Sequence, residues 1–246
     1  MAQSGLKGYK GRGVVLHTIK YGENAMIVHM LTDVGGRQSF IVQGVRSSRG
    51  RGSKAALFQP LFTVEFEGLE SSRTELHKFR EVRSGITLRR TPFDVRRSTI
   101  ALFIAEVLYR LVKESGRNET LFERVWHAIE SLDTIEEGVA NFHLWFLANL
   151  SRELGFTPSG RYSDGAWFDI REGSYTRFEP AGGYAMSRDE SWLLNQMMTR
   201  EVTQLGEVKI SREQRVALLE ALLKYYGYHL DEIHSVQSIA ILRELF

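Results

Sequence analysis

The chain has 246 residues, of which 43% are hydrophobic and 25% charged, and its formal net charge is +2, as expected for a globular protein of one or two domains. It contains no cysteine, which excludes disulfides, thiol catalysis and cysteine-ligated zinc or iron–sulfur sites. No run approaches the roughly 18 apolar residues that span a bilayer. No apolar segment follows the positively charged N-terminus, so we expect no secretory signal and a protein of the cytoplasm.

The first 83 residues have the pattern of a small β domain. Short runs rich in β-branched residues alternate with turn residues. Five strands are predicted here, at residues 13–21, 25–32, 37–45, 61–67 and 74–82. Five short strands joined by tight turns indicate a small closed barrel or a sandwich.

A basic segment, residues 46–54 (RSSRGRGSK), separates the third and fourth predicted strands. Residues 1–97 hold 17 Lys and Arg against 8 Asp and Glu, whereas residues 98–246 hold 15 against 22. The contrast is sharpest between Asp33 and Glu65, a stretch with five cations and no acid. Arginine pairs bidentately with phosphate, so this stretch predicts a surface that binds a polyanion. The alternative is a solvated loop that only promotes solubility.

From Pro92 onward the pattern is helical. Six helices are predicted, at residues 92–114, 121–132, 135–154, 187–198, 212–228 and 236–245. The third is apolar on nearly every side, which indicates the centre of a bundle. Between the third and fourth helices, residues 156–187 are rich in Gly and aromatic residues and predict hairpins at 166–170 and 174–178. We therefore expect an α+β protein with a β domain at 1–83 and a helical domain at 84–246 that carries a β-hairpin insertion at 156–187.

Catalytic motifs are missing from the sequence. There is no phosphate loop of the form G-x-x-x-x-G-K-[ST], no H-E-x-x-H pair and no G-x-S-x-G elbow. His229 and His234 flank two acidic residues where one predicted helix ends and the next begins, an arrangement that suits the helix dipoles without a metal. We expect no enzymatic activity, no metal site and no cofactor.

Several short motifs occur in the order found in the RecO family of bacterial recombination mediators. The first third of the chain contains GVVLHTIKYGE at 13–23, GVRSS at 44–48 and QPL at 59–61. The remainder contains NETLF at 118–122, LGFTP at 154–158, FEPAGG at 178–183 and SIAILRELF at 238–246. The chain resembles that family over essentially its whole length.

The resemblance implies an N-terminal five-stranded OB-fold-like barrel, a helical domain and, in many members, a zinc-binding insertion with four cysteines. Here the positions of those cysteines fall on Ser163, Ala166, Met186 and Asp189, which are not a set of zinc ligands. We expect a zinc-free insertion held together by aromatic packing.

The resemblance also implies a function in DNA repair: binding single- and double-stranded DNA at the nucleoid and loading the RecA recombinase onto DNA coated by single-stranded-DNA-binding protein. A RecR-type partner, the tail of the single-stranded-DNA-binding protein, and strand annealing belong to the same expectation. The predicted DNA-binding residues are Lys10, Arg12, Arg37, Arg46, Arg49, Arg51 and Lys54. Further arginines between residues 80 and 97 extend this track. An RNA-binding or ribosome-associated OB-fold factor is the alternative.

Three aromatic residues near these cations are candidates for stacking against unpaired bases. Phe40 falls within an apolar strand and is expected in the core, whereas Tyr9 and Phe58 are open to either role. The sequence shows no strong aromatic platform, so electrostatics is expected to dominate binding.

Overall fold

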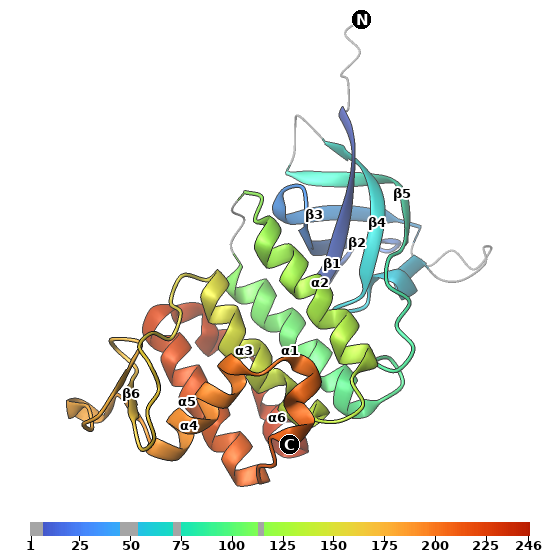
Figure 1. The fold of residues 1–246 in the computed structure, drawn as a ribbon. Coiled ribbons are helices and arrows are strands. Elements are labelled where there is room, and N and C mark those ends of the chain that lie inside the picture. The colour runs from blue at the N-terminus through green and yellow to red at the C-terminus, as the bar shows by residue number, and fades with distance from the viewer. Residues whose placement is uncertain (1–6, 45–53, 71–74, 113–115) are drawn as a thin grey trace, which may run out of the picture. The chain divides into compact units, whose positions relative to one another are not determined.

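The computed structural model describes residues 7–44, 54–70, 75–112 and 116–246. The chain forms two compact units, one from Met1–Phe93 with Ile104–Glu130 and one from Asp94–Phe103 with Ser131–Phe246. The first contains a closed five-stranded barrel, and the second is mainly helical with a small extra sheet, which confirms the predicted α+β class (Figure 1). The domain limits at 83 and 84, and at 156 and 187, stay predictions.

Five strands close the barrel in the order β1-β2-β3-β5-β4. Their bounds are β1 Lys7–Tyr21, β2 Ala25–Thr32, β3 Gly36–Gln43, β4 Thr63–Glu70 and β5 Leu76–Ser84. Strand β1 is long enough to pair with two neighbours: its residues 13–21 pair with β2, and its residues 7–14 pair with β4. Among the pairings of these five strands, only that of β3 with β5 is parallel. A five-stranded closed barrel of this kind is OB-fold-like, which excludes the sandwich alternative.

The barrel core follows from the alternation of side chains along each strand. Val28 and Met30 from β2 and Phe40 and Val42 from β3 point inward and are buried. The short 3-10 helix η1 (Lys54–Phe58) adds Phe58 to the same core. Burying side chains of this size stabilises the folded state by about 1.5–3 kcal/mol each.

The fourth strand starts two residues later than predicted, at Thr63, because Leu61 has a left-handed backbone conformation with φ 65°. Its side chain is buried, and its backbone N–H donates to the carbonyl of Val15 over 2.7 Å. The N–H of Val15 in turn donates to the carbonyl of Phe62 over 2.8 Å. The chain is therefore anchored to β1 through this turn before β4 begins.

Six α-helices follow the barrel strands in the described chain, and all six were predicted. Their bounds are α1 Val95–Leu111, α2 Glu119–Thr134, α3 Phe142–Glu153, α4 Arg188–Thr199, α5 Arg212–His229 and α6 Ile239–Leu245. Capping boxes fix the starts of α4 and α5: Ser187 with Glu190, and Ser211 with Gln214. Each box satisfies two backbone N–H groups that a helix N-terminus leaves without partners.

Helix α3 begins seven residues after its predicted start at 135. Gly138 interrupts the segment with φ 78°, and a Cβ atom there would lie 2.4 Å from the carbonyl carbon of Leu205. Only glycine fits this close approach. A 3-10 turn, η2 (Val139–Asn141), follows, and α3 starts directly after it.

Helices α3, α4 and α5 pack against one another in the helical unit. The buried side of α3 includes Phe142, Leu144, Leu147 and Leu150, and the Tyr226 hydroxyl on α5 donates to the carbonyl of Leu147 over 2.7 Å. The prediction that this helix lies at the centre of a bundle is thus confirmed.

A three-stranded sheet, ordered β7-β6-β8, forms between α3 and α4 in sequence. Its strands are β6 Trp167–Asp169, β7 Ser174–Thr176 and β8 Ala185–Met186. The predicted segments 166–170 and 174–178 pair with each other as a single hairpin, and a third short strand, β8, was missed. Phe168 is buried, and its ring lies 5.2 Å from that of Tyr175 and 5.3 Å from that of Tyr225. Aromatic packing therefore ties the sheet to α5.

Candidate nucleic-acid interface

The five barrel strands divide sharply by charge. Strands β1, β2 and β3 contain no Asp or Glu and are called here the acid-free half; their cations are Lys7, Lys10, Arg12, Lys20 and Arg37. Strands β4 and β5 are called the mixed-charge half; they carry Glu65, Glu67, Glu70 and Glu81 together with Lys78, Arg80 and Arg83. Since only the first half lacks carboxylates, it is the better candidate for binding phosphates.

In the mixed-charge half, arginines are held by neighbouring carboxylates. Arg80 Nη1 lies 2.9 Å from Glu67 Oε1, and Arg83 Nη2 lies 2.5 Å from Glu65 Oε2. A groove of about 790 Å³ runs over β1, β4 and β5 and is lined by four carboxylates and three cations. This mixture makes the groove a poor site for a polyanion.

Arg12, a predicted DNA-binding residue, makes structural contacts. Its Nε lies 3.1 Å from Asp33 Oδ2, and its guanidinium also pairs with Glu123 on α2. The same group lies 5.0 Å from the ring centre of Phe122 and 5.2 Å from that of Trp126. The hydrogen bonds with Glu123 raise the pKa of Arg12. DNA contact by Arg12 stays a prediction, but its observed partners join β1 to α2.

Arg37 on β3 is also engaged. Its Nη1 donates to the carbonyl of Tyr109 over 2.5 Å, and its guanidinium lies 5.3 Å from the Tyr109 ring. That carbonyl is among the last of helix α1, where a cation stabilises the negative end of the helix dipole. Arg37 thus caps α1, and its contact with DNA stays a prediction.

The structure describes only some of the remaining cations that were predicted to bind DNA. Lys10 on β1 is exposed. Arg46, Arg49 and Arg51 lie outside the described residues, and only the backbone of Lys54 is described. Two further cations outside the predicted site set, Lys20 on β1 and Lys78 on β5, are exposed. Among the described residues, no carboxylate lies within ion-pair distance of Lys10, Lys20 or Lys78.

The arginine track predicted to extend beyond the barrel is not continuous. Arg97 is 5% exposed and its guanidinium donates to the carbonyls of Leu132 and Ile135, the latter over 2.5 Å. It caps the C-terminus of α2, so its side chain is unavailable to DNA.

None of the three aromatic residues singled out from the sequence is a free stacking surface. Phe40 is fully buried, as predicted, and Phe58 is buried beside it. Tyr9 packs edge-on against Phe66, and its hydroxyl lies 2.8 Å from His77 Nδ1. Burial raises the pKa of Tyr9 to about 12 and lowers the pKa of His77.

Sequence reasoning missed an apolar surface on the outside of the acid-free half. Ile19 and Tyr21 at the end of β1 are 43% and 52% exposed. Ile27 on β2 and Ile41 on β3 are partly exposed and lie in the same row of the sheet as Ile19. The alternation within residues 13–21 places Ile19 and Tyr21 on one side of the strand, and this signal was present in the sequence.

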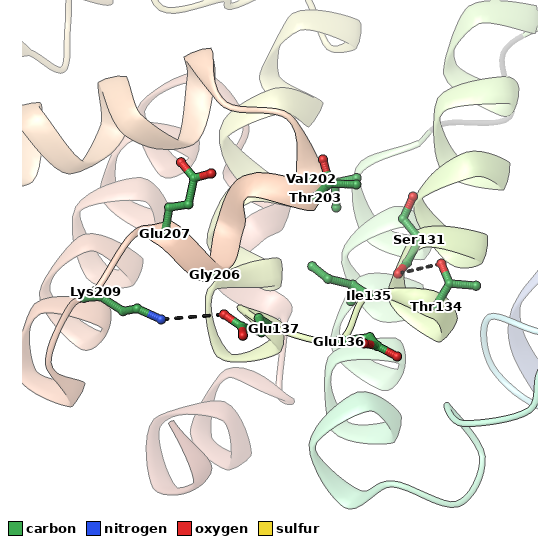
Figure 2. A pocket seen from close by; sticks show the side chains of 10 residues that line it. All are labelled: Ser131, Thr134, Ile135, Glu136, Glu137, Val202, Thr203, Gly206, Glu207 and Lys209. Atoms are coloured by element: carbon green, nitrogen blue, oxygen red, sulfur yellow. Dashed lines mark hydrogen bonds and ion pairs between the residues drawn. The ribbon is translucent and has the colours of Figure 1, made fainter.

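The helical unit contains a cavity of about 640 Å³ between the end of α2, residues 136 and 137, and the 3-10 helix η4 (Val202–Glu207) (Figure 2). Three carboxylates line it, those of Glu136, Glu137 and Glu207, against one ammonium, that of Lys209. Lys209 Nζ lies 3.8 Å from Glu137 Oε2. The excess of negative charge makes this cavity unsuitable for phosphate.

Two further kinds of site have no candidate among the described residues. No group of three or more His, Asp or Glu side chains there is arranged to hold a metal ion. His229, one of the two histidines weighed from sequence, has its ring stacked on Phe156 at 4.8 Å. No helix in the described part of the chain is long and apolar enough to cross a membrane.

Comparison with known proteins covers both units. Residues 6–85 match the family described as Recombination protein O N terminal, and residues 92–236 match Recombination protein O C terminal. Neither description names an enzymatic activity.

Full-length relatives carry one name, DNA repair protein RecO. The protein of Bacteroides fragilis is 37% identical over 237 residues, which cover 95% of this chain and 97% of the relative. The proteins of Phocaeicola vulgatus and Flavobacterium johnsoniae are 35% and 31% identical, covering 95% and 96% of this chain and 97% and 98% of theirs. With an OB-fold-like barrel, a helical region and these matches along nearly its whole length, the chain belongs to the RecO family of DNA repair proteins.

Proposed function

We propose that the protein is a non-enzymatic recombination mediator that binds DNA through its barrel. The observation that carries the proposal is the acid-free half: three adjacent strands with five cations and no carboxylate, in a chain that belongs to a DNA repair family. Lys10, Lys20 and Lys78 supply charge on the barrel, and residues 46–54 extend it in the sequence.

Binding of this kind is expected to depend on salt and little on base sequence. Each cation that neutralises a phosphate releases condensed counterions, which makes affinity fall as salt rises. Phosphate contacts position a protein on DNA without distinguishing bases. A mediator that must act wherever single strands arise needs this combination.

The proposed role includes partners. The protein would act at the nucleoid in the cytoplasm with a RecR-type protein, contact the tail of single-stranded-DNA-binding protein, and promote loading of the RecA recombinase on the coated strand. A cationic surface also lowers the repulsion between two phosphate backbones, so strand annealing and double-strand binding are part of the proposal. Family membership supports these roles.

The test is a DNA-binding titration at several salt concentrations. Replacing Arg46, Arg49, Arg51 and Lys54 with Ala is expected to weaken affinity. The slope of log affinity against log salt should fall by about 0.7 for each phosphate of a single strand that the variant no longer neutralises. The control variant replaces four cations that are in ion pairs with carboxylates: Arg83, Arg117, Lys209 and Arg243. Equal affinities for the two folded variants would overturn the site assignment.

Competition separates the proposal from the RNA-binding alternative. Single-stranded DNA and structured RNA are offered together at physiological salt, with and without single-stranded-DNA-binding protein. A mediator retains the DNA when the coating protein is present, whereas preferential retention of RNA would contradict the proposal.

A further inference from the structure

The outer side of the acid-free half carries a continuous row of apolar side chains. Strand register places Ile19 opposite Ile27, Ile27 opposite Ile41, and Ile41 opposite Lys78 on β5. Tyr21 lies one row further along, opposite Ala25. Since Val28, Phe40 and Val42 fill the interior, their neighbours Ile27 and Ile41 project outward.

Among the described residues, helix α1 covers one end of this row, and the side chains at the other end are exposed. Tyr109 of α1 stacks against His17 at 4.6 Å and lies 5.3 Å from His29, closing the sheet surface there. Beyond that contact, Ile19 and Tyr21 are about half exposed. We call Ile19, Tyr21, Ile27 and Ile41 together the isoleucine surface.

A small cleft borders the isoleucine surface where β3 and β5 stop pairing. The parallel pairing ends at Ile41 and Lys78, and a cavity of about 290 Å³ follows, lined in part by Ile41, Gln43, Lys78 and Phe79. This volume is near the lower end of the range in which proteins hold small ligands. Lys78 therefore lies between the isoleucine surface and this cleft.

The charges around the isoleucine surface fit a polyanion. No strand that contributes to it contains an acidic residue, and Lys78 lies opposite Ile41 at one end of the row. Lys20 lies between Ile19 and Tyr21 in β1 and so projects to the other side of the strand. Two carboxylates are nearby: that of Glu23 in the β1–β2 turn, and that of Glu81, which lines the adjoining cleft together with Lys78 and Arg80. The N–H of Gly44 donates to the carbonyl of Asn24 in the β1–β2 turn over 2.9 Å, so the basic segment 46–54 follows directly in sequence from the exposed end.

We propose that the isoleucine surface binds the unpaired bases of single-stranded DNA, with Tyr21 as a stacking residue and Lys78 as a phosphate contact. This inference rests on the proposed function and adds a preference for single strands. An aromatic ring stacks on any base, because every base has a π-face, and aliphatic side chains cover the remaining base surface. A duplex hides those faces inside its stack, so it can use Lys78 but not Tyr21.

The test compares Tyr21→Ala with Tyr228→Ala, since Tyr228 on α5 is 50% exposed and so matches Tyr21. Fluorescence anisotropy titrations use oligo(dT) and a duplex of equal length, and thermal unfolding checks that each variant is folded. Tyr21→Ala is expected to lower oligo(dT) affinity about tenfold, the effect of removing one stacked base, and to leave the salt slope and duplex affinity unchanged. Tyr228→Ala is expected to change neither affinity, and Tyr21→Trp is expected to retain the wild-type affinities.

Three results would overturn this inference. An unchanged oligo(dT) affinity for Tyr21→Ala means that the surface does not contact bases, and an equal decrease on both DNAs means that it does not select single strands. Unchanged DNA binding with weakened binding of a RecR-type partner assigns the surface to a protein instead. Failure of the proposed function is distinct, because then the wild-type protein itself binds neither DNA.

Discussion

The acid-free half of the barrel carries five cations and no carboxylate, whereas the mixed-charge half carries three cations and four carboxylates. Among described side chains, Arg80 and Arg83 in the mixed-charge half are held by Glu67 and Glu65 on the neighbouring strand β4, whereas Lys78 has no carboxylate within ion-pair distance. In the acid-free half, Arg12 pairs with Asp33 and Glu123, which lie outside the strands of that half, and Lys20 has no described carboxylate within ion-pair distance. A paired guanidinium must give up its carboxylate before it can bind phosphate. The number of positive residues therefore predicts a binding surface less well than the distribution of their partners.

Strand β1 belongs to both environments, and its pairing explains why. Its first part lies against β4, where Lys10 is opposite Glu67 and Arg12 is opposite Glu65. Its last part lies against β2, where Tyr21 is opposite Ala25. The cations of this one strand therefore lie beside carboxylates where it pairs with β4 and beside apolar residues where it pairs with β2.

The largest expected effect comes from reversing two positive charges of the acid-free half and comparing the variant with one that reverses two ion-paired positive charges. Lys10→Glu with Lys20→Glu, both in the acid-free half, is expected to lower single-stranded DNA affinity about 30- to 100-fold, because two cations no longer neutralise phosphates and two repulsive charges are added. Arg83→Glu with Arg117→Glu changes the net charge equally at two ion-paired cations. Its expected effect is under about fivefold at physiological salt, where charges beyond about 8 Å are screened.

Anisotropy titration of the two double variants measures this difference. Melting temperatures show whether either variant is unfolded, and the wild-type protein gives the reference slope against salt. Equal decreases in affinity would mean that DNA responds to overall charge and not to the acid-free half.

Arg12→Met tests whether a cation of the acid-free half serves the fold instead of DNA. Methionine keeps an apolar stem against Phe122 and Trp126 but leaves Asp33 and Glu123 without their cation. Because the Arg12 side chain is 36% exposed, we expect a decrease of about 1–2 kcal/mol in the free energy of unfolding. Urea unfolding measures it, and a double-mutant cycle with Glu123→Gln isolates the pair. A large decrease in DNA affinity at unchanged stability would show that Arg12 contacts DNA.

The fold was predictable because its signals are local. Strand alternation and tight turns indicated five strands, and helical periodicity indicated six helices, with most ends within a few residues. Four errors remain: β1 starts at Lys7 instead of residue 13, the short strand β8 was missed, and two boundaries were misplaced. Tertiary contacts decide the backbone at those two boundaries: Leu61 takes a left-handed conformation against β1, and Gly138 packs against Leu205. No pattern within a short window contains information on such contacts.

The candidate interface was only partly predictable. The acid-free stretch was visible in the sequence, but the carboxylate of Glu123 beside Arg12 is 111 residues away along the chain. The same holds for Tyr109, whose carbonyl accepts from Arg37. The isoleucine surface arises because three strands place one residue each in the same row, which requires knowledge of the register.

The smallest expected effect on DNA affinity comes from removing two carboxylates from the mixed-charge half, which makes it more like the acid-free half. Glu65→Gln with Glu67→Gln removes the partners of Arg83 and Arg80. Exposed pairs of this kind contribute about 0–1 kcal/mol to stability, so the variant is expected to stay folded. Its freed guanidinium groups can then bind phosphate, and we expect single-stranded DNA affinity to rise about threefold with a steeper salt dependence.

The matched control removes two carboxylates elsewhere, with Glu119→Gln and Glu220→Gln, which free Arg117 and Arg243. Both variants change the formal net charge from +2 to +4. If the control gains as much affinity as the barrel variant in the same titrations, the gain reflects total charge alone. The two variants differ only in where the freed arginines lie. A gain in DNA affinity confined to the barrel variant therefore means that the carboxylates on β4 prevent DNA from binding to the mixed-charge half.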